Sequence, residues 1–205
     1  MKEKITEGAE SLFIRYGIRS ISMDDVAREL SISKKTIYQH FKNKDELVSE
    51  ATRYHLDLER AQIDATIVGA KDAMEELFLL SKCMRENISR LNPSLIYDLQ
   101  KYHSDAWEFF KNFKDHFMKG KVRDNIKRGK EEGFFRPEVD EEILSTMRVE
   151  QVQMIFNERI FPKTDYDFVT TQMQVYDHFI HGLLSEKGYK KYHHYNQLIK
   201  NHNTK

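Results

Sequence analysis

Residues 22–47 read SMDDVARELSISKKTIYQHFKNKDEL. The stretch opens with a serine followed closely by two acids, a pattern typical of a capped helix start. After a short turn, a second helix is expected to begin at Ser33. Four lysines and one histidine, but no acid, lie between Lys34 and Lys44. A short helix with a basic, hydroxyl-rich start suits the major groove of DNA, so the stretch predicts a helix-turn-helix motif over about residues 22–41.

The preceding residues complete a small helical domain. Apolar residues recur at helical spacing from Ile5 to Tyr16, and Gly17 stands where a left-handed residue commonly ends a helix. Ile37 and Phe41 are expected to face inward, which leaves the basic side of their helix to solvent. The alternative is a three-helix module that is charged only for solubility, but caps, turn and charge agree on DNA binding. The expected DNA-binding residues are Ser22, Ser33, Lys34, Lys35, Thr36, Tyr38, Gln39, His40 and Lys44.

Residues 5–50 resemble the DNA-binding domain of the TetR family of bacterial transcriptional regulators. The matching segments are Tyr16-Gly17, ISMDDVA at 21–27, SKKTIYQHF at 33–41 and KDEL at 44–47. The resemblance implies that Tyr38, His40 and Lys44 bind phosphates. It also implies that Lys34, Lys35 and Thr36 face bases.

Two positions depart from the commonest family pattern. Ser31 stands where the family often has a glycine in the turn, and serine tolerates such a turn at some energetic cost. Met23 stands where the family often has a threonine that contacts phosphate. One backbone contact of the family is therefore not expected here.

The whole chain predicts an all-α protein of about nine helices. It has 205 residues, few glycines and only three prolines. No apolar run approaches the ~20 residues that a membrane span needs, no signal peptide is visible, and a single cysteine fits a reducing compartment. A cytoplasmic location without a membrane partner is expected. The predicted domains are 1–47 for DNA binding and 48–205 for a helical effector-binding and dimerisation bundle.

The last two long helices have the apolar spacing of association helices. The favoured interpretation is a homodimer joined by a symmetric four-helix interface, which the family resemblance also implies. The alternative is that both apolar faces serve the core of one monomer. The expected interface residues are Val149, Val152, Phe156, Val169, Met173, Tyr176, Ile180 and Leu183.

An aromatic segment outlines a candidate pocket for a small-molecule effector. Core packing explains most of these side chains better, but they could also line a site. Glu150 interrupts a stripe shared with Ile143, Met147 and Met154, so a buried carboxylate is expected there. Pairing with Arg148 or Arg159 of the partner subunit is preferred over a ligand contact. The candidate pocket residues are Tyr102, His103, Trp107, Phe110, Phe113, Phe117, Met147, Glu150, Met154 and Tyr176.

The other groups of residues give weaker evidence of function. His178 and His181 lie one helical turn apart, but two ligands make no closed metal site, and solvent exposure explains them better. Cys83 is expected to be a buried, inert thiol. The basic run between Lys119 and Lys130 is expected to be the solvated side of a long helix. No catalytic set, metal site or cofactor motif is found, so no enzymatic activity and no cofactor are expected.

The sequence therefore predicts a homodimeric, ligand-responsive regulator, most simply a repressor. Two recognition helices related by the dimer axis would bind double-stranded DNA at a palindromic operator. A small-molecule effector of unknown identity would release the DNA. The alternative is a dimeric DNA-binding regulator that has no small-molecule effector.

Overall fold

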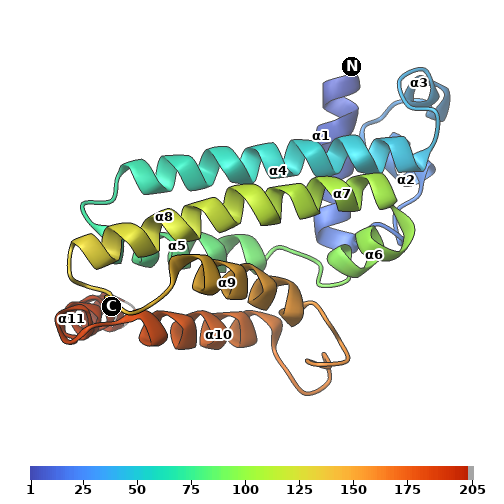
Figure 1. The fold of residues 1–205 in the computed structure, drawn as a ribbon. Coiled ribbons are helices and arrows are strands. Elements are labelled where there is room, and N and C mark those ends of the chain that lie inside the picture. Colours follow the sequence, from blue (N-terminus) through green and yellow to red (C-terminus); the bar gives the residue numbers. More distant parts are fainter. Residues whose placement is uncertain (203–205) are drawn as a thin grey trace. The chain divides into compact units, whose positions relative to one another are not determined.

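The computed structural model describes the backbone of residues 1–202 and the side chains of residues 1–194. Every regular element in that range is a helix, which confirms the all-α prediction (Figure 1). An isolated bridge between Phe135 and Leu184 is the one extended pairing among the described residues. No described helix is long and apolar enough to cross a membrane.

The chain forms two compact units. The first comprises residues 1–62 and 87–114, and the second comprises residues 63–86 and 115–205. The predicted functional boundary after residue 47 falls inside the first unit. That boundary stays a prediction about function, because compactness alone does not test it.

The first unit is built on the N-terminal helices. Its elements are α1 (Lys2–Tyr16), α2 (Met23–Glu29), α3 (Lys34–Tyr38), most of α4 (Lys44–Val68), α6 (Leu95–Tyr102) and α7 (Ser104–Asn112). Gly17 ends α1 with a φ of 81°, as its position in the sequence predicted. Ile5, Val26, Ile37 and Leu47 are fully buried, one from each of the first four helices. Helical spacing of apolar residues therefore sets this core.

The aromatic segment contains a helix break and a change of helix type. His103, at φ −134° and ψ 73°, separates α6 from α7. The segment Phe113–Met118 is a π-helix, and α8 (Lys119–Glu131) follows it. No glycine or proline marks the change to the π-helix, so residue type did not reveal it.

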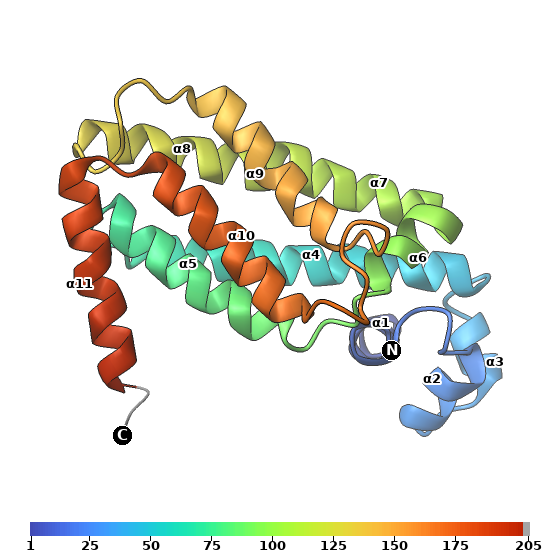
Figure 2. The ribbon, with the colours of Figure 1, turned by 90° about the horizontal axis from the view of Figure 1, so that it is seen from below.

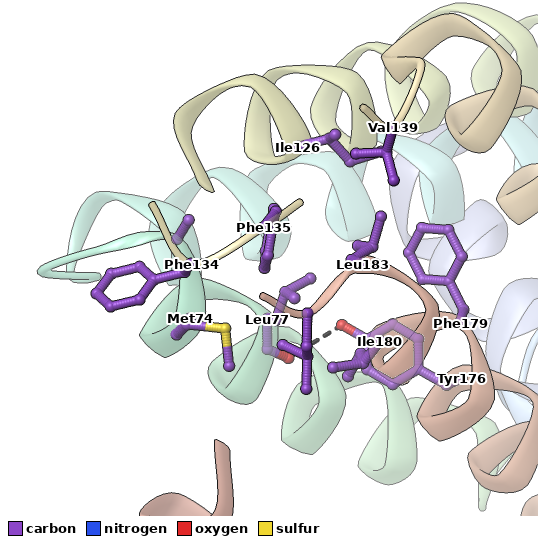
Figure 3. Packing of buried hydrophobic residues seen from close by; sticks show 12 residues of the cluster. Met74, Leu77, Ile126, Phe134, Phe135, Val139, Tyr176, Phe179, Ile180 and Leu183 are labelled. Carbon is purple, nitrogen blue, oxygen red and sulfur yellow. Dashed lines mark hydrogen bonds between the residues drawn. The ribbon is translucent and has the colours of Figure 1, made fainter. Parts of the chain in front are cut away.

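The second unit is a helical bundle with an aromatic and aliphatic core. It contains most of α5 (Ala73–Ile88), then α8, α9 (Glu141–Ile155), α10 (Phe168–Leu183) and α11 (Glu186–His202). Helices α9 and α10 run side by side, and α11 crosses the end of the bundle near the start of α5 (Figure 2). Leu77, Ile126, Phe135, Phe179 and Leu183 meet in the core (Figure 3).

A close approach of α8 to the following turn fixes one end of this core. A β-carbon added at Gly129 would lie 2.1 Å from two ring carbons of Phe135. Phe135 is 1% exposed, and its backbone N–H donates to the Gly129 carbonyl at 3.0 Å. Only glycine at this position allows the ring to lie flat against the helix backbone.

Candidate nucleic-acid interface

Side-chain caps define both helices of the helix-turn-helix motif. Ser22 accepts a hydrogen bond from the Asp25 backbone N–H, and the Asp25 carboxylate accepts one from the Ser22 N–H at 2.9 Å. These two bonds form the capping box expected from the sequence. The hydrogen bonds from Ser22 lower the pKa of Asp25. Ser33 caps α3 by accepting from the Thr36 N–H at 3.1 Å.

Ser31 makes the turn between α2 and α3. Its φ is 54°, the one positive φ of a non-glycine residue among the described residues. The turn thus has the left-handed conformation for which glycine is the usual residue. The Ile32 N–H donates to the Ala27 carbonyl at 3.0 Å, which closes the turn against α2. The strain at Ser31 is tolerated because both flanking helices are capped.

The outer face of α3 is exposed and carries most of the predicted DNA-binding side chains. Ile37 is fully buried and anchors the inner face, whereas Lys35 and Gln39 are exposed and Tyr38 is 47% exposed. Thr36 and His40 are half-buried at the edges of this face. An outward set of amine, amide and hydroxyl groups on a short helix can donate to both base edges and phosphates.

Three of the predicted DNA-binding residues have structural partners within the chain. The Lys34 ammonium donates to Asp24 at 2.7 Å, and this hydrogen bond raises the pKa of Lys34. Lys34 is exposed, so it can exchange this acid for a DNA acceptor. Ser22 and Ser33 act here as helix caps, and any role for their hydroxyls toward DNA is secondary to that structural one.

Lys44 differs from the other predicted phosphate-binding residues. Its Nζ donates to the backbone carbonyl of Ile18 at 2.6 Å, so the side chain ties the start of α4 to the loop after α1. Burial lowers the pKa of Lys44, against the opposing effect of Asp98 and other acids. Phosphate binding by Lys44 therefore stays a prediction, and in this structure its ammonium already has a backbone acceptor. Met23 is buried, which agrees with the expected loss of one backbone contact.

The predicted dimer residues separate into two groups. Val149, Tyr176, Ile180 and Leu183 are buried in the core of their own chain, so they have almost no surface left for a partner. For these four, the alternative of a monomer core is correct. The other four are half-buried in the single chain: Val152, Phe156, Val169 and Met173.

The predicted pocket residues do not form one group either. Five lie in the first unit, namely Tyr102, His103, Trp107, Phe110 and Phe113. Trp107 stacks on Phe110 with ring centroids 5.4 Å apart, and His103 Nδ1 lies 2.8 Å from an Asp45 carboxylate oxygen. These contacts give structural roles to part of the set. The five in the second unit are Phe117, Met147, Glu150, Met154 and Tyr176.

Glu150 is not the buried ionisable group of α9. Ile143, Met147 and Glu150 do share one face, but that face is exposed, with Ile143 at 64% and Met147 at 42%. Arg148 lies on the opposite face and is only 4% exposed. Arg148 is therefore buried in its own chain, so the expected pairing of Glu150 with Arg148 across a dimer is wrong. Arg148 and Glu150 are two positions apart, which is about 200° around the helix axis, so their side chains lie on opposite faces of α9.

The remaining candidates have simple structural environments. His178 and His181 are exposed, and no described group of three or more potential metal ligands is close enough to hold an ion. Cys83 is half-buried rather than buried. Lysines and arginines of the basic run are ion-paired: Lys119 and Arg123 with Glu142, Lys121 with Asp64, Arg128 with Glu76 and Glu132, and Lys130 with Glu141.

Comparison with known proteins identifies the N-terminal region. Residues 5–51 match the sequence profile described as bacterial regulatory proteins, tetR family. The HTH-type transcriptional regulator YvaF of Bacillus subtilis is 33% identical over 90 residues, which are 43% of this chain and 47% of that protein. The HTH-type transcriptional repressor KstR2 of Mycobacterium tuberculosis is 26% identical over 144 residues, 69% of this chain and 72% of that protein. The match spans about half the length of YvaF.

Solved structures share the fold over most of the chain. A transcriptional regulator from Saccharomonospora viridis, solved in complex with choline, has a TM-score of 0.74 and 21% identity and covers 90% of this chain and 98% of its own. FadR from Bacillus subtilis, solved in complex with stearoyl-CoA, has a TM-score of 0.67 and 14% identity over 89% of this chain and 99% of its own. The fold of these solved regulators and the matched profile agree, and residues 5–51 are a DNA-binding region of the tetR family of bacterial regulatory proteins.

Proposed function

We propose that this chain is a sequence-specific, homodimeric DNA-binding regulator, most simply a repressor that a small-molecule effector releases from a palindromic operator. The observation that carries the proposal is the exposed outer face of α3 on a capped, tightly closed helix-turn-helix. We infer no catalytic role for the chain. We propose that it binds its operator in the bacterial cytoplasm.

The charge distribution supports selective rather than general DNA binding. The formal net charge of the chain is zero, so nonspecific attraction to DNA is weak overall. Lys35, Tyr38 and Gln39 concentrate donors on one short exposed helix. Such a helix covers only a few base pairs, so a single copy gives little affinity. A second copy in the next major groove supplies the rest, and a twofold axis then requires a palindromic site.

The exposed face of α9 supports dimerisation. Ile143 and Met147 are exposed large apolar residues of the second unit, at 64% and 42%, and they lie one turn apart. This exposed apolar pair makes α9 suitable for packing against a copy of itself. Replacing Ile143 with glutamate would place a charge in that interface, and we expect a dimer-to-monomer shift in light scattering. A charge at Val68, which is 87% exposed at the end of α4, is the control and leaves the oligomeric state unchanged.

The relatives support an effector. Two proteins of the same fold were solved with small molecules, choline in one and stearoyl-CoA in the other. In this chain α4, α5 and the π-helical segment each run from one unit into the other, so the units are joined by helices. An effector that prefers one conformation of the second unit shifts the population of DNA-binding states through such connections.

The test is retention of DNA from around the protein's own promoter over a salt series. Specific binding at moderate salt supports the proposal, whereas equal retention of unrelated DNA contradicts it. Lys35→Ala is expected to change which base pairs are preferred. Lys82→Ala, on exposed α5 surface of the second unit, is the matched control and leaves the preference unchanged.

A further inference from the structure

Arg148 is a buried cation without an acid. It points into the second unit from α9 and is 4% exposed. Among the described residues its one polar contact is with the Met84 thioether, whose Sδ lies 3.5 Å from Nη2. Its Nη1 is buried and has no hydrogen-bond partner. A buried guanidinium normally has a carboxylate partner, because leaving water is costly for an unpaired charge.

Two aromatic rings stabilise the charge of this guanidinium but do not satisfy its hydrogen-bond donors. The guanidinium carbon lies 4.7 Å from the ring centroid of Tyr176 and 5.8 Å from that of Phe179. The two rings come from successive turns of α10 and both face the core (Figure 3). Burial still lowers the pKa of Arg148 to about 10. Ring faces attract a cation but offer no acceptor in the plane of its N–H groups, so the hydrogen-bonding need of Nη1 remains.

A second polar side chain shares the same thioether. Gln172 is 2% exposed, and its Nε2 donates to Met84 Sδ at 3.3 Å, while its Oε1 is buried without a partner. Sulfur is a weak acceptor, so Met84 satisfies neither group well. Methionine is also the most adaptable apolar side chain. Displacement of Met84 would open the guanidinium and the amide to a single polar group of a ligand.

A groove lies beside this cluster and shares Tyr176 with it. It has a volume of about 620 Å³ and lies between α5, α10 and α11. Leu77, Met173 and Ile180 line its apolar part, and Tyr176 belongs both to the groove and to the stack on Arg148. The Tyr176 hydroxyl donates to the Leu77 carbonyl at 3.0 Å, which holds the ring in place (Figure 3). Arg148, Gln172 and Met84 are not among the residues that line the groove, so a ligand can reach the guanidinium only when side chains between them move.

The polar wall of the groove fits an anion better than a cation. Arg85, His178 and His181 line it, with Asp177 as the one acid among its lining residues. A carboxylate supplies two acceptors in one plane, which match the fork of a guanidinium. A quaternary ammonium has no acceptor and would approach an uncompensated positive charge. The volume suits a molecule with an apolar body.

We propose that the second unit binds an organic carboxylate with an apolar body, whose carboxylate pairs with Arg148 and whose body fills the groove between α5, α10 and α11. This inference rests on the proposed function, because it gives the chemical class of the effector. The proposed site lies entirely within the second unit, and its anchor is a residue that the sequence analysis considered only as a partner of Glu150.

The test compares three probes of equal chain length on the full chain: octanoate, octanol and octyltrimethylammonium. We expect octanoate to bind tightest by calorimetry. Arg148→Met is expected to weaken octanoate roughly tenfold to a hundredfold and to leave octanol unchanged. Arg148→Lys keeps the charge and recovers part of the loss. Glu150→Gln, on the exposed face of the same helix, is the matched control and keeps wild-type affinity.

Thermal stability without ligand is the second readout. Removing an unpaired buried charge is expected to raise the melting temperature of Arg148→Met, whereas a purely structural arginine would lower it when replaced. Absence of octanoate binding, equal affinity for octanoate and octanol, or unchanged octanoate affinity in Arg148→Met would each overturn the inference. Retention of promoter DNA is measured on the same samples. Intact DNA binding with no octanoate binding removes only the effector class, whereas loss of specific DNA binding removes the proposed function.

Discussion

Replacement of Lys44 by methionine tests whether this lysine serves the fold or the DNA. Methionine keeps the apolar stem and removes the ammonium that donates to the Ile18 carbonyl at 2.6 Å. A hydrogen bond with a charged donor contributes about 1.5–3 kcal/mol. Part of that gain is offset, because the same burial that lowers the pKa of Lys44 also opposes its charge. We therefore expect the free energy of unfolding to fall by about 1–2 kcal/mol.

The assay uses two readouts on one variant. Trp107 is the single tryptophan and lies in the first unit, so its fluorescence in urea follows the unfolding of the unit that contains Lys44. Promoter binding over a salt series gives the second readout, because each phosphate contact contributes about 0.9 to the slope of log affinity against log salt. The slope should not change for Lys44→Met. It should become shallower for Lys35→Met if that exposed lysine binds a phosphate.

A shallower salt slope for Lys44→Met, together with unchanged stability, would refute this reasoning. The lysine would then leave the Ile18 carbonyl in the complex and bind a phosphate, as the family resemblance implied. Lys42→Met is the control, because Lys42 is an exposed neighbour just before α4. We expect its stability to match that of the wild type.

Two further predictions concern stability. Gly129→Ala places a β-carbon 2.1 Å from the Phe135 ring, so overpacking should cost about 1–3 kcal/mol and exceed the gain in helix propensity of about 1 kcal/mol. Gly120→Ala in the same helix is the control, because its β-carbon meets nothing within 4 Å and should raise the thermal midpoint. Equal thermal midpoints for the two variants would contradict the packing argument. The pKa of His55 is raised because its hydrogen bond with Glu10 and the nearby acids outweigh the lowering effect of burial. Its stabilising effect is therefore complete below the unfolded pKa of about 6.5 and is lost as pH rises through the higher folded pKa. The urea midpoint, followed by Trp107 fluorescence, should fall in the wild type as pH rises through this range. In Glu10→Gln the midpoint should depend less on pH.

Local features of the helix-turn-helix could be predicted from the sequence. The caps at Ser22 and Ser33 depend on neighbours within three residues, and the glycine after α1 acts through its own φ. Such effects need no knowledge of distant chain segments. The partner of Lys44 lies 26 residues away, in a loop with no distinctive sequence pattern. Its structural role could not be predicted, because only the tertiary arrangement brings the Ile18 carbonyl to it.

The errors on α9 have a different cause. Spacing correctly grouped Ile143, Met147 and Glu150 on one face, since helical periodicity relates residues to one another. It does not say which face the rest of the protein covers. Two apolar side chains suggested burial, yet the covered face is the one with Arg148. Hydrophobic patterning does not predict the burial of an arginine, so the buried position of Arg148, which carries our effector inference, could not be predicted from the sequence.

The division of the first unit into two chain segments limits how this regulator can be re-engineered. Fusing residues 1–47 to a foreign sensor would discard residues 48–62 and 87–114, which belong to the same compact unit. Leu56, Leu95 and Leu99 are buried there and would be missing from the fusion. A chimaera that exchanges ligand specificity should therefore keep both segments and replace the chain between and after them. A single recombination crossover cannot produce that exchange, because each unit consists of two separate segments of the chain. We therefore expect new effector responses to arise more readily by point substitutions within the second unit.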